Sequence, residues 1–158
     1  MKPVIVVECD NDELLLRILS VPRDRIQHEG NRDEVVKYVL NKPAKHYLGL
    51  IDEDPGTQHG AQRQSFKNGL ARNGILTAVN GQRTLVVLKP FLERWLLDAV
   101  HTCGGRMSAL DKGLSDNARE LHRQFSPRGD KRMTKVVEFL TKQKSKHLAE
   151  LRKALDIT

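Results

Sequence analysis

The sequence predicts an α/β protein with a mainly parallel central sheet flanked by helices and an α-helical C-terminal extension. Over the first hundred residues, short apolar runs rich in β-branched residues alternate with segments of helical periodicity, which favours parallel strands joined by helical crossovers. After Gly104-Gly105 the remaining apolar residues have helical spacing. We therefore expect an α/β domain over residues 1–105 and a basic helical extension over residues 106–158, packed on that domain or following it.

The first half of the chain begins with the continuous apolar run Val4–Val7, a pattern typical of a strand buried on both faces. The polar residues after it allow Asn11 or Asp12 to cap a helix, and Pro22 helps to end that helix. The same alternation then repeats. The elements predicted here are strand Val4–Val7, helix Glu13–Leu19, strand Arg25–His28, a helix from Asn31 or Asp33 to Leu40, and strand His46–Ile51.

The second half contains a long segment without strong periodicity, Thr57–Gly74, which we expect to be a surface loop with a helical turn near Gln64–Ala71. Asn80-Gly81 lies between two strand-like runs and is the strongest short signal for a hairpin. Pro90 fits the first turn of a helix, where its missing N–H costs nothing. The elements predicted here are strands Ile75–Val79 and Thr84–Leu88 and helices Phe91–Val100, Lys131–Thr141 and Ser145–Leu155, with a break near Ser126-Pro127.

Two acidic clusters directly follow predicted buried strands. Glu8 opens the first cluster, and Asp52 and Asp54 form a D-x-D pattern in the second. Ligands of open parallel sheets gather beyond the carboxyl ends of the strands, so we expect both clusters at one edge. Side chains two apart on an extended segment point the same way, which would let both aspartates face one magnesium or manganese ion (Mg²⁺ or Mn²⁺). The alternative is that these acids only cap helices and solubilise loops.

The same residues carry a resemblance to a known family. Val6-Val7-Glu8-Cys9-Asp10-Asn11-Asp12-Glu13 resembles the first motif of the Toprim domain, the catalytic domain of topoisomerases, primases and related nucleases. Leu50-Ile51-Asp52-Glu53-Asp54-Pro55-Gly56 resembles its second motif, and Cys9 stands where the family customarily has glycine. The resemblance covers about residues 3–100. It implies a Rossmann-like fold in which Glu8 is the catalytic acid/base or a metal ligand, and Asp52 and Asp54 hold the metal.

A third stretch, Pro90-Phe91-Leu92-Glu93-Arg94-Trp95-Leu96, resembles a P-x-x-E-x-W-L element of small stand-alone Toprim-like proteins of bacterial mobile and defence loci. This resemblance implies that Glu93 is a further metal ligand. The physical alternative is that a glutamate in the first turn of a helix only interacts favourably with the helix dipole. Phe91 and Trp95 lie on an otherwise apolar helix, so we interpret them as core residues rather than a base-stacking surface.

The positive charge of the chain is concentrated near its end. The formal net charge is +7, and residues 128–158 carry nine Lys or Arg against four Asp or Glu, an excess of five. A basic segment favours a polyanionic partner because phosphate contacts release counterions, although a solvated helix surface has the same composition. The candidate nucleic-acid contacts, in the long loop and in the tail, are Arg63, Lys67, Arg72, Lys131, Arg132 and Lys135.

Other classes of protein are disfavoured by what the sequence lacks. No apolar run approaches the ~20 residues that span a bilayer, and the N-terminus has acids where a signal peptide would be cleaved, so we expect a cytoplasmic protein without a membrane partner. Cys9 and Cys103 form no CxxC, and the histidines lack zinc-site spacing. No glycine-rich phosphate-binding motif is present, which argues against NTP hydrolysis.

The leading interpretation is a magnesium-dependent, Toprim-like nuclease or phosphotransfer domain that acts on nucleic-acid phosphodiesters within a bacterial defence or DNA-processing system. A second interpretation is a haloacid-dehalogenase-type phosphatase, because Asp52, Asp54, Gly56 and Thr57 approximate its D-x-D-G-T loop, although Pro55 interrupts the match. A third is a non-catalytic subunit that binds nucleic acid or an ATPase partner. Metal affinity and assays on phosphomonoesters and phosphodiesters distinguish these interpretations.

Overall fold

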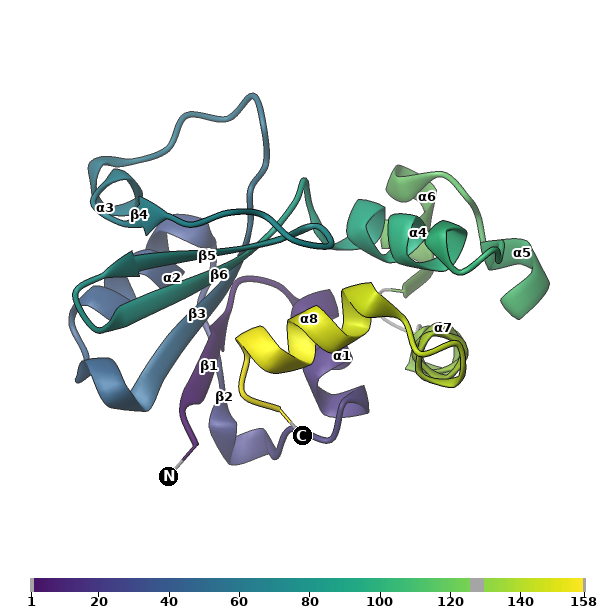
Figure 1. The fold of residues 1–158 in the computed structure, drawn as a ribbon, viewed down its shortest axis with the longest axis horizontal. Coiled ribbons are helices and arrows are strands. Elements are labelled where there is room, and N and C mark those ends of the chain that lie inside the picture. The colour runs from purple at the N-terminus through teal and green to yellow at the C-terminus, as the bar shows by residue number, and fades with distance from the viewer. Residues whose placement is uncertain (1, 126–129, 158) are drawn as a thin grey trace.

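The computed structural model describes residues 2–125 and 130–157 (Figure 1). Its described part contains one six-stranded sheet with the strand order β2-β1-β3-β6-β5-β4. The first four of these strands pair in parallel, and β5 and β4 extend the sheet antiparallel to their neighbours, which confirms the predicted α/β class with a mainly parallel sheet. The strands are β1 (Val4–Val7), β2 (Ile26–His28), β3 (Tyr47–Asp52), β4 (Lys67–Asn68), β5 (Ile75–Asn80) and β6 (Arg83–Leu88).

Helices connect and flank these strands and continue to the end of the chain. They are α1 (Asp10–Ile18), α2 (Arg32–Leu40), α3 (Ala61–Gln64), α4 (Leu92–Thr102), α5 (Met107–Leu110), α6 (Ala118–Phe125), α7 (Asp130–Lys142) and α8 (Lys146–Ala154). The break predicted at Ser126-Pro127 lies outside the described residues. None of the helices in the described ranges combines the length and the apolar character needed to cross a membrane.

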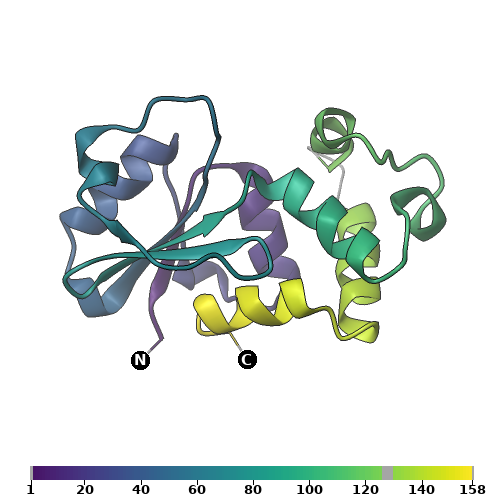
Figure 2. The same cartoon turned by 45° about the horizontal axis from the view of Figure 1, so that its top comes forward.

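Both faces of the sheet are buried. Neighbouring residues along each central strand point to opposite faces, and helices cover both of them. Ile5 and Val7 belong to an apolar cluster with α1, α4 and α8, whereas Val6 packs into a second cluster with α2. Figures 1 and 2 show α2 on one side of the sheet and α1 and α8 on the other. Burial on both faces explains why β1 is a continuous apolar run rather than an alternating one.

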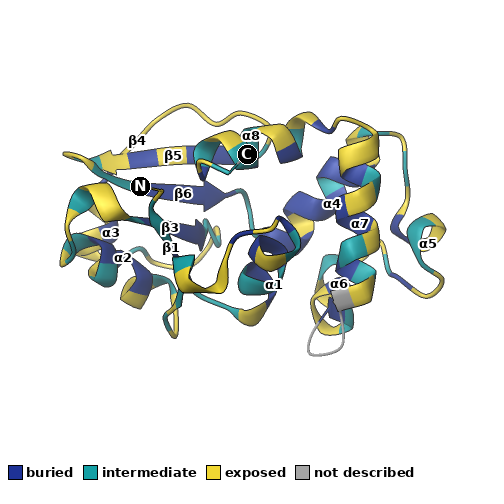
Figure 3. Ribbon diagram, turned by 90° about the horizontal axis from the view of Figure 1, so that it is seen from below, coloured by how far each residue is buried: buried dark blue, intermediate teal, exposed yellow. Residues whose placement is uncertain are grey.

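The C-terminal helices share the core of the sheet. Met133 and Leu140 of α7 and Leu151 of α8 lie in the same apolar cluster as Leu15 of α1 and Trp95 of α4. Figure 3 shows that most of α4 is buried, whereas Arg94, His101 and Thr102 of this helix are exposed. Removing the basic tail would therefore expose the core as well as remove charge, so point substitutions are the cleaner test of what the basic residues do.

Two predicted helix starts are wrong by a few residues. Helix α1 begins at Asp10 with Cys9 as its N-cap, so Asn11 and Asp12 are buried in the first turn instead of capping it. Helix α4 begins at Leu92, which leaves Pro90 outside the helix. Short polar residues after an apolar run signal a helix start but do not fix which residue faces the interior. The Asn31 cap of α2 is confirmed, since its side chain accepts the Glu34 N–H.

The segment predicted as a long loop contains more structure than its composition indicates. Instead of a helical turn near Gln64–Ala71, it forms the short helix α3 and then strand β4, which pairs with the outer edge of β5. The Gly69 N–H also donates to the Thr77 carbonyl oxygen, at 2.9 Å. The edge of β5 offers unpaired backbone groups, so tertiary pairing, rather than local periodicity, fixes this segment.

Candidate metal centre

The sheet topology brings Glu8 and Asp52 together. Strands β1 and β3 are parallel neighbours with Val7 opposite Leu50, so the residues that follow both strands lie at the same edge. Glu8 follows β1 directly, and Asp52 is the last residue of β3. Glu8 Oε1 accepts a hydrogen bond from the Asp52 backbone N–H at 3.4 Å. This contact is between residues 44 positions apart and depends on the parallel register.

The D-x-D pattern predicts that Asp52 and Asp54 lie on one extended segment. In the structure, Asp54 instead reaches the site through a turn after the strand ends. The backbone N–H of Glu53 donates to the Leu88 oxygen, and that of Asp54 donates to the Pro90 oxygen, both at 2.9 Å. Asp54 then adopts a φ of +47°, a left-handed conformation that aspartate tolerates better than most residues. Hydrogen bonds to the end of β6 and to Pro90 therefore hold the turn that places Asp54 beside Asp52.

Glu8, Asp52 and Asp54 form a group able to hold a metal ion. Each offers one carboxylate oxygen, and these three atoms lie within 4.8 Å of one another. Metal–oxygen distances of roughly 2.0–2.6 Å would let a single cation contact all three. Asp52 is held in place by its Oδ1, which accepts the Leu92 N–H at the start of α4, at 3.1 Å. The predicted convergence of these three carboxylates is confirmed.

A second acidic group in the described residues is formed by Asp10, Glu13 and His28. His28 Nδ1 lies 3.6 Å from an Asp10 oxygen and 3.8 Å from a Glu13 oxygen. The Asp10 side chain is 83% exposed. Ion pairing at the surface accounts for this arrangement, and we assign no metal to it.

Burial shifts the pKa values of Glu8 and Asp52, two of the partly buried carboxyls of the first group. Burial raises the pKa of Glu8 to about 7, with a further contribution from the Asp54 charge. Burial also raises the pKa of Asp52 to about 10, and the charges of Asp12 and Glu8 add to the effect. Asp12, which is fully buried behind them, has a pKa raised by burial to about 8. A divalent cation would favour the charged forms that burial disfavours.

Asp12 lies beside the centre without a complete set of partners. Its Oδ2 accepts a hydrogen bond from the Cys9 thiol at 3.1 Å, whereas its Oδ1 has no partner among the described residues. Burial raises the pKa of the Cys9 thiol, which keeps the thiol protonated and unreactive. Cys9 lines the pocket and is partly buried, whereas Asp12 is fully buried next to it.

We expect the metal-free protein to lose stability as the pH rises. The pKa values of Glu8, Asp12 and Asp52 are all higher in the folded chain than their ordinary values of 4.5, 3.8 and 3.8, so the folded state binds protons more tightly than the unfolded chain. The stability that the protonated carboxyls provide is fully present below about pH 4. It is lost as the pH rises through the pKa values that these groups have in the folded chain. In EDTA the melting temperature should fall by several degrees between pH 6 and pH 9.

Two controls belong with this measurement. Asp52→Asn removes one of the titrating carboxyls, so its melting temperature should vary less with pH than that of the wild type. Adding magnesium or manganese at pH 9 should raise the wild-type melting temperature more than that of the variant. Equal pH profiles for the two proteins would show that these carboxyls do not carry the effect.

Glu93 lies at the same pocket but outside the three-carboxylate group. Its side chain is only 6% exposed, and its Oε1 lies 2.6 Å from His122 Nδ1 of α6. The same oxygen accepts a hydrogen bond from the Asn11 amide at 3.1 Å. Glu93 thus links α1, α4 and α6 beside the site, and its carboxylate is engaged by the protein itself.

A pocket of about 810 Å³ lies between the carboxyl ends of β1 and β3 and helix α6. Its lining includes the three carboxylates, Glu93 and Phe91, together with arginine and histidine side chains from two elements. The sequence interpretation missed these residues, although the spacing of those on α6 places them on one helix face. They are Arg32 of α2 and Arg119, His122 and Arg123 of α6.

Arg32 braces the loop that follows the D-x-D turn. Its guanidinium donates to the Glu53 oxygen, the Thr57 hydroxyl and the Gln58 oxygen, each at 3.1 Å. Its side chain is only 11% exposed. We therefore assign Arg32 to positioning the loop that carries Asp54 rather than to direct contact with a ligand.

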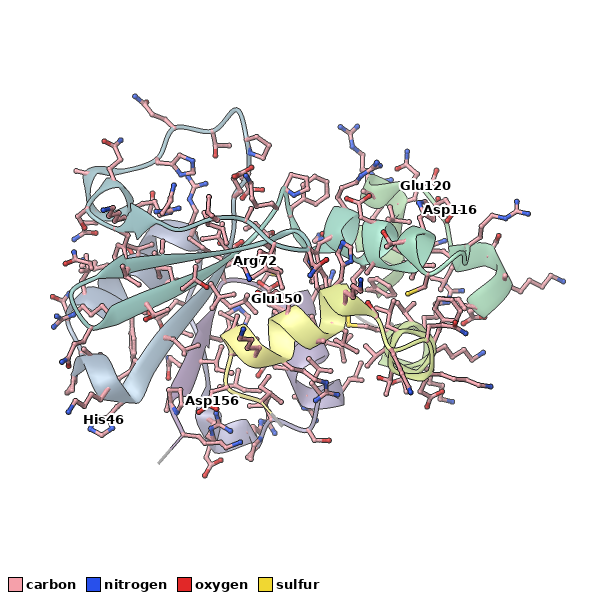
Figure 4. The ribbon with its side chains drawn as sticks, in the orientation of Figure 1. His46, Arg72, Asp116, Glu120, Glu150 and Asp156 are labelled. Atoms are coloured by element: carbon pink, nitrogen blue, oxygen red, sulfur yellow. The ribbon has the colours of Figure 1, made fainter. Side chains whose placement is uncertain are left out.

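The six basic residues predicted to contact nucleic acid do not line this pocket. Arg63 is only 7% exposed and its guanidinium donates to Asn68 Oδ1 at 2.8 Å, so it braces the chain between α3 and β4 instead of presenting a surface cation. Lys67 and Arg72 are exposed near the sheet edge; Arg72 is labelled in Figure 4. On α7, Lys131 is exposed, and Arg132 and Lys135 lie 3.8 and 3.7 Å from Asp111 oxygens.

No protein-family model, no curated protein and no solved structure matches this chain. The functional assignment therefore depends on the geometry of the pocket and on the chemistry of its side chains.

Proposed function

We propose that this chain is a metal-dependent phosphotransfer domain that cleaves nucleic-acid phosphodiesters with Mg²⁺ or Mn²⁺. The observation that carries the proposal is the convergence of Glu8, Asp52 and Asp54 within 4.8 Å at one end of the parallel strands, inside a pocket. Small, hard cations prefer such carboxylate sets. A bound cation supplies charge stabilisation for a phosphoryl group and lowers the pKa of a water nucleophile.

The protein side chains have separate roles in this proposal. Asp52 and Asp54 hold the cation, and the Leu92 N–H fixes the orientation of Asp52. Glu8 exchanges protons with the reacting water through Oε2, since its Oε1 accepts the Asp52 N–H. Burial raises the pKa of Glu8 above its ordinary value in the metal-free chain, and a carboxyl whose pKa is raised toward neutrality is suited to both accept and release a proton.

The resemblance of these segments to the Toprim motifs supports the same assignment. The segments around Glu8 and around Asp52-Glu53-Asp54 follow neighbouring parallel strands, which is the arrangement that both motifs need in order to share one ion. We therefore propose that the chain is a small stand-alone Toprim-like enzyme. The resemblance implies a protein of a bacterial defence or DNA-processing system.

A cleavage assay on the purified chain tests the proposal. Plasmid, single-stranded DNA and RNA are incubated with magnesium, manganese or EDTA, beside a generic phosphomonoester, while calorimetry measures metal affinity. We expect metal binding and phosphodiester cleavage, both absent in EDTA. Metal binding without cleavage would favour a binding subunit, and hydrolysis of the phosphomonoester alone would favour the haloacid-dehalogenase-type interpretation. Absence of metal binding would overturn the proposal.

A further inference from the structure

Helix α6 forms a cationic wall of the pocket. Arg119 and Arg123 are one helical turn apart, are exposed, and both line the pocket that holds the carboxylates. Neither arginine forms a salt bridge with any other residue in the described ranges, in contrast to Arg132 and Lys135 of α7, which lie beside Asp111. Two unpaired guanidinium groups facing the same pocket as three carboxylates point to a ligand with more than one anionic group.

The position of this wall is fixed by buried contacts. Leu121 and Phe125 on the opposite side of α6 are buried in the core, and the Asn117 side chain accepts the N–H groups of Arg119 and Glu120 at the start of the helix. Figure 4 labels Glu120 on α6. Between the two arginines, His122 contacts the buried carboxylate of Glu93, as described above. The arginines are therefore presented on a rigid element at a set place relative to the carboxylates.

Phe91 adds an aromatic surface to the same pocket. The sequence interpretation assigned it to the core with Trp95, but only Trp95 is a core residue; Phe91 is partly exposed and lines the pocket. It immediately precedes Leu92, whose N–H donates to Asp52, so the ring is attached next to the metal centre. An aromatic face in a basic groove is the feature that proteins use to stack the bases of single strands.

We propose that the pocket binds a single nucleic-acid strand, with one phosphate at the carboxylate centre, a neighbouring phosphate on Arg119 and Arg123, and a base stacked on Phe91. This inference rests on the proposed function and adds the form of the substrate and the site of the second phosphate. A paired duplex covers the faces of its bases, so it cannot use Phe91. A mononucleotide bears no phosphate beyond its own terminus, so it cannot occupy both ends of the pocket.

Fluorescence anisotropy with labelled oligonucleotides tests this site. The measurements use protein with the Glu8→Gln substitution, which keeps both aspartates and slows turnover, in magnesium over a range of salt concentrations. Adding Arg119→Gln with Arg123→Gln should weaken single-strand binding roughly 10-fold or more and reduce the slope of log affinity against log salt by about 0.7, the value for one phosphate contact. Adding Phe91→Leu should weaken binding roughly 5-fold or more without changing the slope.

The matched control is Lys142→Gln with Lys146→Gln, which removes two exposed cations that do not line the pocket. It should bind the single strand nearly as the parent does, and melting curves should show that all variants fold. If the α6 variant binds like this control, or if a duplex or a mononucleotide binds as tightly as the single strand, the inference is wrong. A loss of binding confined to the α6 and Phe91 variants, in a protein whose wild type cleaves nothing, would support the strand site and reject the catalytic proposal.

Discussion

Replacing Asp52 with alanine is expected to abolish metal binding and phosphodiester cleavage together. The change removes one of the two aspartates assigned to hold the cation, in a group whose carboxylate oxygens lie within 4.8 Å of one another, and Asp54 alone should hold a divalent ion poorly. Because a bound metal supplies several kcal/mol of transition-state stabilisation, cleavage should fall roughly 10²-fold or more. Calorimetry with manganese and the nicking assay measure the two losses, and excess manganese should partly restore both.

The isosteric variant Asp52→Asn separates the charge of Asp52 from its structural contact. An asparagine oxygen can still accept the Leu92 N–H, so the start of α4 should stay in place while the metal is lost. Asp52→Asn should melt in EDTA no lower than the wild type at neutral pH, since burial disfavours the charged form of this carboxyl. A variant that melts much lower in EDTA while still binding metal would mark Asp52 as structural.

Replacing Glu8 with glutamine is expected to fail in a different way. Glutamine keeps the size of the side chain and an oxygen for the Asp52 N–H, but it cannot transfer a proton. If Glu8 is the acid/base, turnover should fall ~10²–10⁴-fold while manganese affinity changes little. Single-turnover cleavage over a range of pH values measures the effect, and the variant should lose the pH inflection that titration of Glu8 is expected to give in the wild type.

Glu13→Gln is the matched control for this change. Glu13 lies on the neighbouring helix α1, belongs to the surface group with His28, and does not line the pocket. It should cleave at the wild-type rate. Should Glu8→Gln lose manganese affinity to the same extent as Asp52→Ala, Glu8 would be a metal ligand rather than the group that transfers protons.

Local pattern predicted the parallel part of the sheet and the two acidic clusters after its strands, and the resemblance to the Toprim motifs supported the choice of Glu8, Asp52 and Asp54. Val4–Val7 has the composition of a strand buried on both faces, and the acidic residues that follow such strands have only one edge of a parallel sheet to occupy. The alternation of apolar and polar segments along the sequence predicts where the strands end, and Glu8 and Asp52 lie at those ends.

The tertiary structure alone decided how Asp54 returns to the centre and which charged residues surround it. The turn at Asp54 is held by the end of β6, the Asn11–Glu93 bond joins residues 82 positions apart, and the His122–Glu93 contact joins residues 29 apart. Arg63 became a buried brace, whereas Arg119 and Arg123 became the wall of the pocket. The sequence around a charged residue looks the same whether the residue is a buried brace or lines a pocket. Helical and strand periodicity depend only on neighbours along the chain. The packing of distant elements determines whether its charge is buried against a partner or faces a ligand.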